Sequence, residues 1–247
     1  MTLARPYLRL PSIQPRPGMP PRLDLSPPER AGSAVKIISW NLLRRIGATV
    51  RDVIDLIRTE QPDLLLMQEA TVEIDTLPTL IGGHYARSPL PGRIHGLACW
   101  SPWPYRRQPL TCTLPAGTLI RRVAQVVECR SLVVANVHLS HGQLLNRRQL
   151  RRVVQLLPHR AAILGDFNQV GPALIRHFQD VGPREPTHRM ADMLPIRLDR
   201  CLVRGLTCVE RHVIENYASD HRPISVLLRP SDAPGRTQAA PDRRDHR

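Results

Sequence analysis

The chain has 247 residues, 42% of them hydrophobic, which is enough for one large folded domain or two small ones. It holds no run of about eighteen apolar residues and no uninterrupted apolar leader, so we expect neither a transmembrane helix nor a secretory signal. The formal charge of +14 favours an anionic partner, such as nucleic acid or an anionic membrane surface, although an arginine-rich genome would produce the same excess.

The ends of the chain differ from its middle. Residues 1–33 hold eight prolines without sustained periodicity, which predicts an extended or disordered arm. Residues 230–247 are polar and charged and predict a disordered tail. One folded domain is therefore expected over residues 34–229. The five cysteines form no C-x-x-C pair, which indicates reduced thiols in a cytoplasmic protein rather than a disulfide framework or a zinc site.

Strands and helices alternate within this domain. Apolar patterning predicts strands over residues 35–40, 63–69, 96–101, 119–129, 132–139, 161–165, 197–203, 208–214 and 223–228, and helices over 49–60 and 145–157. On the second helix, four arginines between positions 147 and 152 are expected on the solvent side. Many strands with a few long helices between them predict an α/β domain of two sheets flanked by helices.

Polar residues recur where the predicted strands end. They are Asn41, Glu69, Asn136, His138, Asp166, Asn168, Asp199, Asp220 and His221. One such residue is usually a cap or a turn, whereas a set that converges on one sheet edge would be a site. Asp166 and Asn168 would point the same way if extended geometry continued through them. A simple turn after Gly165 is the alternative for that pair.

The residue types in this set fit one kind of chemistry. Carboxylates and amides supply the oxygen ligands that Mg²⁺ prefers. His138 and His221 can exchange protons near neutral pH, and Asp199 is suited to hold one imidazole in its useful tautomer. The inventory predicts metal-assisted hydrolysis of a phosphate ester.

Seven short motifs occur in a fixed order along the domain. They are SWN (39–41), QPDLLLMQE (61–69), HGLACWSPWP (95–104), NVHL (136–139), GDFN (165–168), RLDRCLV (197–203) and SDHRPI (219–224). Together they resemble the endonuclease/exonuclease/phosphatase superfamily, the fold of deoxyribonuclease I. The resemblance covers residues 34–229 and implies an α/β four-layered sandwich, in which two packed, mostly antiparallel β-sheets are flanked by helices and the site lies at one rim.

The resemblance also implies a role for each site residue. Glu69 is the principal Mg²⁺ ligand, helped by Asn41 and Asp220, and Mn²⁺ is expected to substitute. His221 acts as a general base or stabilises the transition state, and Asp199 orients it.

For the phosphate itself, the resemblance assigns three residues. Asp166 positions or deprotonates the attacking water, or protonates the leaving group. Asn168 and His138 bind the scissile phosphate. Three other histidines, His84, His95 and His141, lie near motifs and are weaker candidates for substrate contact.

Three functions remain open at this point. The charge favours a Mg²⁺-dependent nuclease that works as a monomer. The alternative is a phosphodiesterase or phosphatase that acts on a phospholipid head group or a small phosphate ester, with Trp100, Trp103 and Tyr105 as the aromatic residues available for lipid contact. A non-catalytic binding protein on the same fold is the third, and the complete set of polar residues argues against it.

Overall fold

A computed structural model describes residues 34–117, 121–190, 194–216 and 218–231. It contains two six-stranded sheets and a small two-stranded hairpin, β10 (His188–Met190) with β11 (Leu194–Ile196). The predicted arm at 1–33 and nearly all of the predicted tail at 230–247 lie outside the described residues. No described helix is long and apolar enough to cross a membrane.

The first sheet has the strand order β13-β14-β1-β2-β4-β3. Its strands are β1 (Val35–Asn41), β2 (Leu64–Ala70), β3 (His84–Pro89), β4 (Gly96–Ser101), β13 (Leu206–Val213) and β14 (Ile224–Pro230). Only β1 and β2 are parallel, and α1 (Val50–Glu60) forms the crossover between them. A short turn of 3₁₀ helix, η1 (Arg44–Ile46), follows β1, and η2 (Val72–Thr76) with α2 (Leu77–Ile81) follows β2.

The second sheet repeats this plan with the order β5-β6-β7-β8-β12-β9. Its strands are β5 (Leu110–Thr113), β6 (Val123–Cys129), β7 (Leu132–His138), β8 (Ala161–Asp166), β9 (Gln179–Asp180) and β12 (Asp199–Arg204). Here β7 and β8 are the parallel pair, and α3 (Gln143–Gln155) is the crossover. The strand order of the two sheets could not be read from the sequence, because late strands pair with much earlier ones. These late strands are β12 in the second sheet and β14 in the first.

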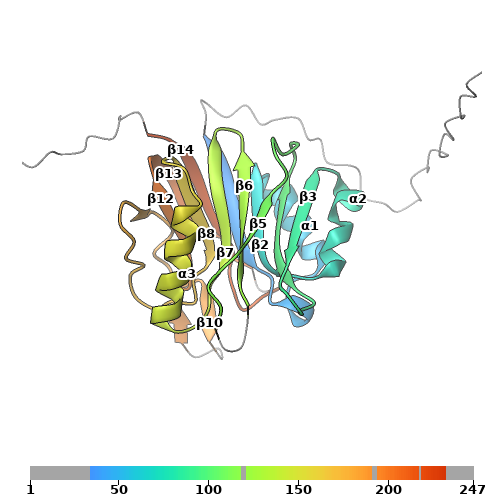
Figure 1. Cartoon of the computed structure of the whole chain (residues 1–247). Helices are drawn as coiled ribbons and strands as arrows, with labels where there is room; N and C mark the ends of the chain where they lie inside the picture. Colours follow the sequence, from blue (N-terminus) through green and yellow to red (C-terminus); the bar gives the residue numbers. More distant parts are fainter. Residues whose placement is uncertain (1–33, 118–120, 191–193, 217, 232–247) are drawn as a thin grey trace, which may run out of the picture.

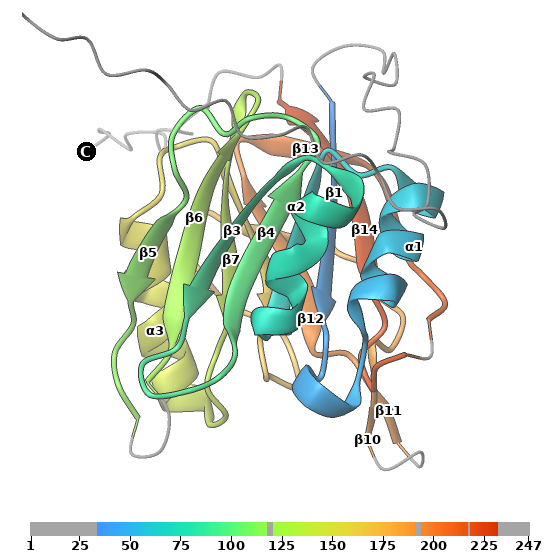
Figure 2. The same cartoon turned by 90° about the vertical axis from the view of Figure 1, so that its right-hand side faces the viewer.

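Three apolar clusters divide the molecule into four layers. Ile37, on the inner face of β1, packs in the cluster between the two sheets. Its neighbour Ile38 points to the opposite face and packs under α1 and α2. A third cluster joins α3 to the outer face of the second sheet. Figures 1 and 2 show α3 on one side of the paired sheets and α1 with α2 on the other, which confirms the predicted sandwich.

The two sheets are also joined by a buried polar network. Asn136 on β7 donates to the backbone oxygens of Met67 (3.1 Å) and Ala98 (3.0 Å) and accepts from Gln68 Nε2 (2.7 Å). Asn136 is fully buried, so the expectation that it stands at the sheet edge with the other polar residues is wrong. Its amide ties β7 to β2 and β4 because buried polar groups must find hydrogen-bond partners.

The arrangement brings the carboxyl ends of four central strands together. In each sheet the parallel pair runs the same way, so β1, β2, β7 and β8 all end at the lower end of the molecule in Figures 1 and 2. Ligand sites in α/β folds favour the carboxyl ends of parallel strands, and this end is where the predicted polar residues fall.

Candidate active site

A cavity of about 580 Å³ opens at this end of the sandwich. Both sheets contribute to its lining, which consists of Asn41, Leu43, Arg44, Glu69, His95, Arg122, His138, His141, Asp166, Asn168, Val170, His188, Ile196, Leu198, Asp220 and His221. Every residue that was assigned a catalytic, metal or phosphate role from sequence lines this one cavity, with the exception of Asp199. Asp199 is fully buried directly behind His221.

Glu69 reaches the cavity through an irregular end of β2. The pairing of β2 with β4 shifts register between Met67 and Ala70, and Glu69 has a φ of 56°. This left-handed conformation is uncommon for a residue with a side chain, and strained backbone of this kind gathers at functional sites. The bulge therefore aims a carboxylate into the cavity that a regular strand would not place there.

The Glu69 carboxylate has the properties of a cation ligand. Its Oε2 is buried and accepts no hydrogen bond from any described residue, and Arg44 Nε lies 3.6 Å away. Burial raises the pKa of Glu69, although Arg44 and Arg122 oppose the effect. Asn41 stands beside it, accepting a hydrogen bond from Leu43 N (3.1 Å) through Oδ1.

The GDFN segment places Asp166 by a tight backbone contact. Gly165 has a φ of 141°, and a Cβ at this position would lie 1.9 Å from Val137 O. Only glycine permits this approach of β8 to β7. Asp166 follows at the end of the strand with its side chain buried, and its Oδ2 accepts from Asn41 Nδ2 at 3.0 Å.

Asn168 reaches the same cavity by a turn rather than by extended geometry. Its φ is 47°, so the strand does not continue through Asp166 and Asn168 as the spacing suggested. Instead Asp166 Oδ1 accepts from Asn168 N at 2.8 Å, and Asn168 Nδ2 donates to Leu139 O at 3.0 Å. The intervening Phe167 is fully buried under α3, which anchors the turn.

His221 is held between two carboxylates. Its Nδ1 lies 2.8 Å from Asp199 Oδ2, and its Nε2 lies 3.7 Å from Asp166 Oδ2. Thr187 Oγ1 accepts from the Asp199 amide at 3.0 Å, and Trp40 Nε1 donates to His221 O at 3.0 Å. Burial alone would lower the pKa of His221, but Asp199 and Asp166 outweigh it and raise the pKa to about 9.

His138 has the opposite character. It is buried, and its Nε2 lies 3.4 Å from Asp166 Oδ2. Burial, together with the nearby charges of Arg122 and His221, holds its pKa well below the ordinary value. His138 is therefore a neutral hydrogen-bonding group at pH 7.

Asp220 belongs to a separate cluster at the cavity wall. Its Oδ2 lies 3.3 Å from His188 Nε2, and ligand atoms of these two residues and of His221 all lie within 4.8 Å of one another. A second such group joins Asp166, Asp199 and His221. Among the described residues, Glu69 belongs to neither group, although it lines the same cavity as Asp220.

Sequence reasoning missed several of the residues that line the cavity. Arg44, Arg122 and His188 stand outside the motifs, and only Arg44, three residues after Asn41, is close enough to one to be noticed. His95 and His141, the weaker candidates, do line the cavity. His84 begins β3 opposite Ser101, at the far end of the sheet.

Comparison with known proteins agrees with this geometry. The endonuclease/exonuclease/phosphatase family model matches residues 38–221. A UPF0294 protein of Yersinia pseudotuberculosis is 27% identical over 243 residues, covering 87% of this chain and 92% of that protein. An endonuclease/exonuclease/phosphatase from Bacteroides vulgatus superposes with a TM-score of 0.69 at 14% identity, covering 80% of this chain and 99% of that one. D. rerio TDP2 complexed with a single-strand DNA product superposes with a TM-score of 0.62 at 17% identity, covering 80% and 99%. The chain belongs to the endonuclease/exonuclease/phosphatase family.

Proposed function

We propose that this protein is a Mg²⁺-dependent phosphodiester hydrolase and that its substrate is a nucleic acid. One observation carries the proposal: Glu69, Asp166 and His221, which lie more than a hundred positions apart at the extremes, line a single cavity. Two proton-exchanging groups and a carboxylate with a buried oxygen that accepts no hydrogen bond from the described residues, all in one cavity, are the parts that phosphoester hydrolysis needs.

The residues present fit a divalent metal ion. Glu69 Oε2 is buried and accepts no hydrogen bond among the described residues, and Asn41, Asp166 and Asp220 line the same cavity with further oxygen donors. Glu69 and Asn41 would hold Mg²⁺ or Mn²⁺, and Asp220 is a further candidate ligand. When bound, such an ion neutralises charge that develops on the phosphate oxygens.

Asp166 is placed to orient the attacking water and to accept its proton. Its Oδ2 accepts from Asn41, and it faces His138 and His221. Burial raises the pKa of Asp166, although His221 opposes the effect, and a higher pKa makes a carboxylate a better proton acceptor.

His221 is placed to stabilise charge on the phosphoryl group. Asp199 fixes its Nδ1, which leaves Nε2 free to donate into the cavity. With its pKa near 9, the ring is protonated at neutral pH and acts as a donor to an oxyanion rather than as a base. His138 and Asn168 then bind the remaining phosphate oxygens as neutral groups.

Charge supports nucleic acid as the substrate. Residues 34–231 contain 26 lysines and arginines against 16 aspartates and glutamates, so the excess does not depend on the ends of the chain. A relative of the same fold, D. rerio TDP2, forms a complex with a single-strand DNA product, which is consistent with this choice.

A lipid phosphate ester is a second candidate because of the side chains around the cavity. Val170 lines it and is 68% exposed, while Ile46, Ile94 and Leu144 are 85%, 48% and 79% exposed and lie within three positions of a lining residue. Exposed aliphatic groups beside arginines suit a membrane interface. The aromatic candidates do not contribute: Trp100 is buried, and Trp103 and Tyr105 line a different pocket.

One substrate panel separates these functions. The full chain is incubated with plasmid, single-stranded DNA, RNA and anionic phospholipid vesicles, each with Mg²⁺, with Mn²⁺ and with EDTA. We expect metal-dependent cleavage of a nucleic acid that falls about a thousandfold or more in His221→Ala and is unchanged in His84→Ala, a histidine distant from the cavity. Hydrolysis of lipid alone would favour the second candidate function over the nuclease. If no substrate is hydrolysed, the hypothesis of a non-catalytic binding protein remains.

A further inference from the structure

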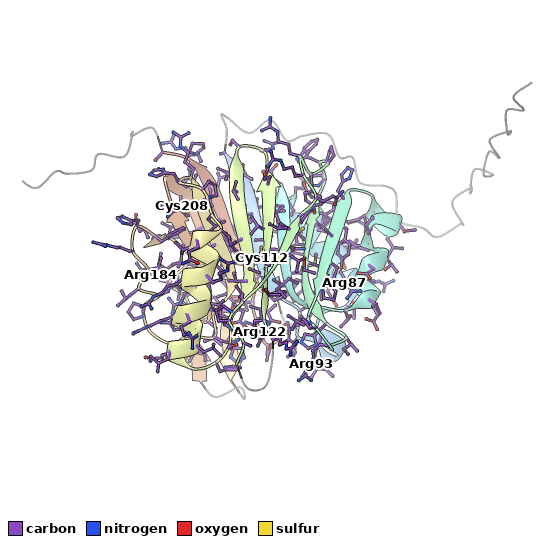
Figure 3. The ribbon with its side chains drawn as sticks, in the orientation of Figure 1. Arg87, Arg93, Cys112, Arg122, Arg184 and Cys208 are labelled. Carbon is purple, nitrogen blue, oxygen red and sulfur yellow. The ribbon has the colours of Figure 1, made fainter. Side chains whose placement is uncertain are left out.

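Arg122 is a buried cation whose counter-charges, Asp166 and Glu69, form no close ion pair with it. It lies immediately before β6, its side chain lines the cavity, and the residue is only 5% exposed. No carboxylate of the described residues lies within 4.0 Å of its guanidinium, and its buried Nε donates to none of them. Figure 3 shows Arg122 toward the lower end of the sandwich. Burying a charge without a close ion pair is costly, so a further anion in the cavity would stabilise this arrangement.

Arg200 shows how this chain normally buries an arginine. Its exposure is 3%, close to that of Arg122, yet it pairs with Asp180 Oδ2 at 3.0 Å and donates to the backbone oxygens of Gln169 and Gly171. The two are the buried arginines of the described chain, and the Nε of each lacks a hydrogen-bond partner. Among the described residues, only Arg200 also forms an ion pair and hydrogen bonds through its terminal nitrogens. A close counter-charge for Arg122 is therefore expected from a ligand in the cavity.

His95 lies at the same side of the cavity and, like Arg122, has a buried nitrogen without a hydrogen-bond partner in the described part of the chain. It is 4% exposed, lines the cavity, and its buried Nδ1 has no hydrogen-bond partner among the described residues. Burial, with Arg44 and Arg122, lowers its pKa to about 4. The ring is therefore neutral at pH 7 and offers one N–H donor beside the guanidinium.

The strand order separates these two residues from the catalytic histidine. His95 precedes β4 and Arg122 precedes β6, which lie toward one edge of their sheets and contact each other. His221 precedes β14 and Asp199 begins β12, and both strands lie on the other side of the central strands. Asp166 lies between, at the end of β8.

We propose that Arg122 and His95 form a second anion site in the cavity, which binds a phosphate group of the substrate other than the one being hydrolysed. The inference rests on the proposed hydrolase and narrows its substrate to molecules with at least two phosphate groups. A planar guanidinium with unused donors is matched to paired phosphate oxygens.

Binding of inorganic phosphate in EDTA tests the site without any catalysis. Calorimetric titration compares the full-length protein with Arg122→Gln and with Arg121→Gln, in which an exposed neighbouring arginine changes. We expect Arg122→Gln to weaken phosphate binding about 10- to 100-fold, the range for a charged hydrogen bond, and Arg121→Gln to bind as before. Unaltered binding in Arg122→Gln, equal loss in both variants, or no binding by the unaltered protein would each overturn the site.

Thermal unfolding distinguishes a ligand site from a structural role. In phosphate-free buffer, Arg122→Gln removes a buried charge that has no close ion pair, so its Tm should equal or exceed that of the unaltered protein. A lower Tm would show that the guanidinium supports the fold and would overturn the proposal.

A pair of small substrates then tests the choice of a second phosphate. Dinucleoside monophosphates are compared with and without an additional terminal phosphate. The doubly phosphorylated compounds should have a KM about tenfold or more lower, and Arg122→Gln should abolish that difference. An unchanged preference in Arg122→Gln contradicts the site. If the protein hydrolyses no substrate but still binds phosphate in a way that depends on Arg122, the proposed function is refuted and the anion site is not.

Discussion

Replacing Glu69 by glutamine separates metal binding from stability. The substitution keeps the shape of the side chain but removes a carboxylate whose Oε2 is buried without a hydrogen bond among the described residues. Its neighbour Arg44 is half exposed and 3.6 Å away, so the lost ion pair is worth only a few tenths of a kcal/mol, about the value of a surface pair. In EDTA, Glu69→Gln should therefore be as stable as the unaltered protein, or more stable.

The response to Mg²⁺ should differ sharply. A metal ion present at about a hundred times its Kd stabilises the folded state by about 2.7 kcal/mol. For a domain of this size that corresponds to a rise in Tm of about 5 to 10 °C. The unaltered protein should show this rise, while Glu69→Gln should show almost none and should lose its hydrolytic activity.

Differential scanning calorimetry with and without Mg²⁺ measures both effects. Glu128→Gln serves as the control because it makes the same change on β6 at the opposite end of the molecule, where Glu128 lines the separate pocket. A Mg²⁺-induced rise in Glu69→Gln equal to that of the control would refute the assignment of Glu69 as a metal ligand. A lower Tm in EDTA would show instead that the carboxylate supports the fold.

Other substitutions test the groups that support the site. Asp199→Asn removes the charge paired with His221, so steady-state kinetics should show kcat about 10²- to 10⁴-fold lower with KM little changed; an unchanged kcat would contradict the orienting role. Gly165→Ala places a Cβ 1.9 Å from a carbonyl oxygen, and urea titration should show a loss of about 3 kcal/mol or more; full stability would refute the close approach. Burial would raise the pKa of Asp180, but its two arginine partners outweigh it and lower the pKa. Its stabilisation is therefore present above the ordinary pKa of 3.8 and lost as pH falls below it. Asp180→Asn should cost about 2 kcal/mol at pH 7, and unfolding curves of the two proteins should converge in acid.

The central strands were predictable from sequence because both of their faces are buried. β1, β2, β7 and β8 are continuous apolar runs, and such runs are the clearest strand signal. The edge strand β5 and the short β9 were missed because their residues are mostly exposed and carry no apolar pattern. β3, also at a sheet edge, was missed because its residues carry no apolar pattern.

The residues of the site also differ in how far they could be predicted from sequence. Residues inside motifs, such as Asp166 and His221, could be named from sequence because their neighbours are distinctive. Arg122 and His188 could not, since neither lies in a motif, and one of many arginines becomes notable only when folding buries it without a close ion pair. The turn at Asn168 also could not be predicted from sequence, because an asparagine two residues after an aspartate fits either an extended or a left-handed backbone.

The pairing of β14 with β1 closes the first sheet between the two ends of the described chain. His221 lies just before β14, so the ring reaches Asp199 only after the last strand has docked on the first. A polypeptide still emerging from the ribosome lacks both the imidazole and the strand that seats it. The His221–Asp199 pair is therefore completed only when segments from both ends of the described domain have come together.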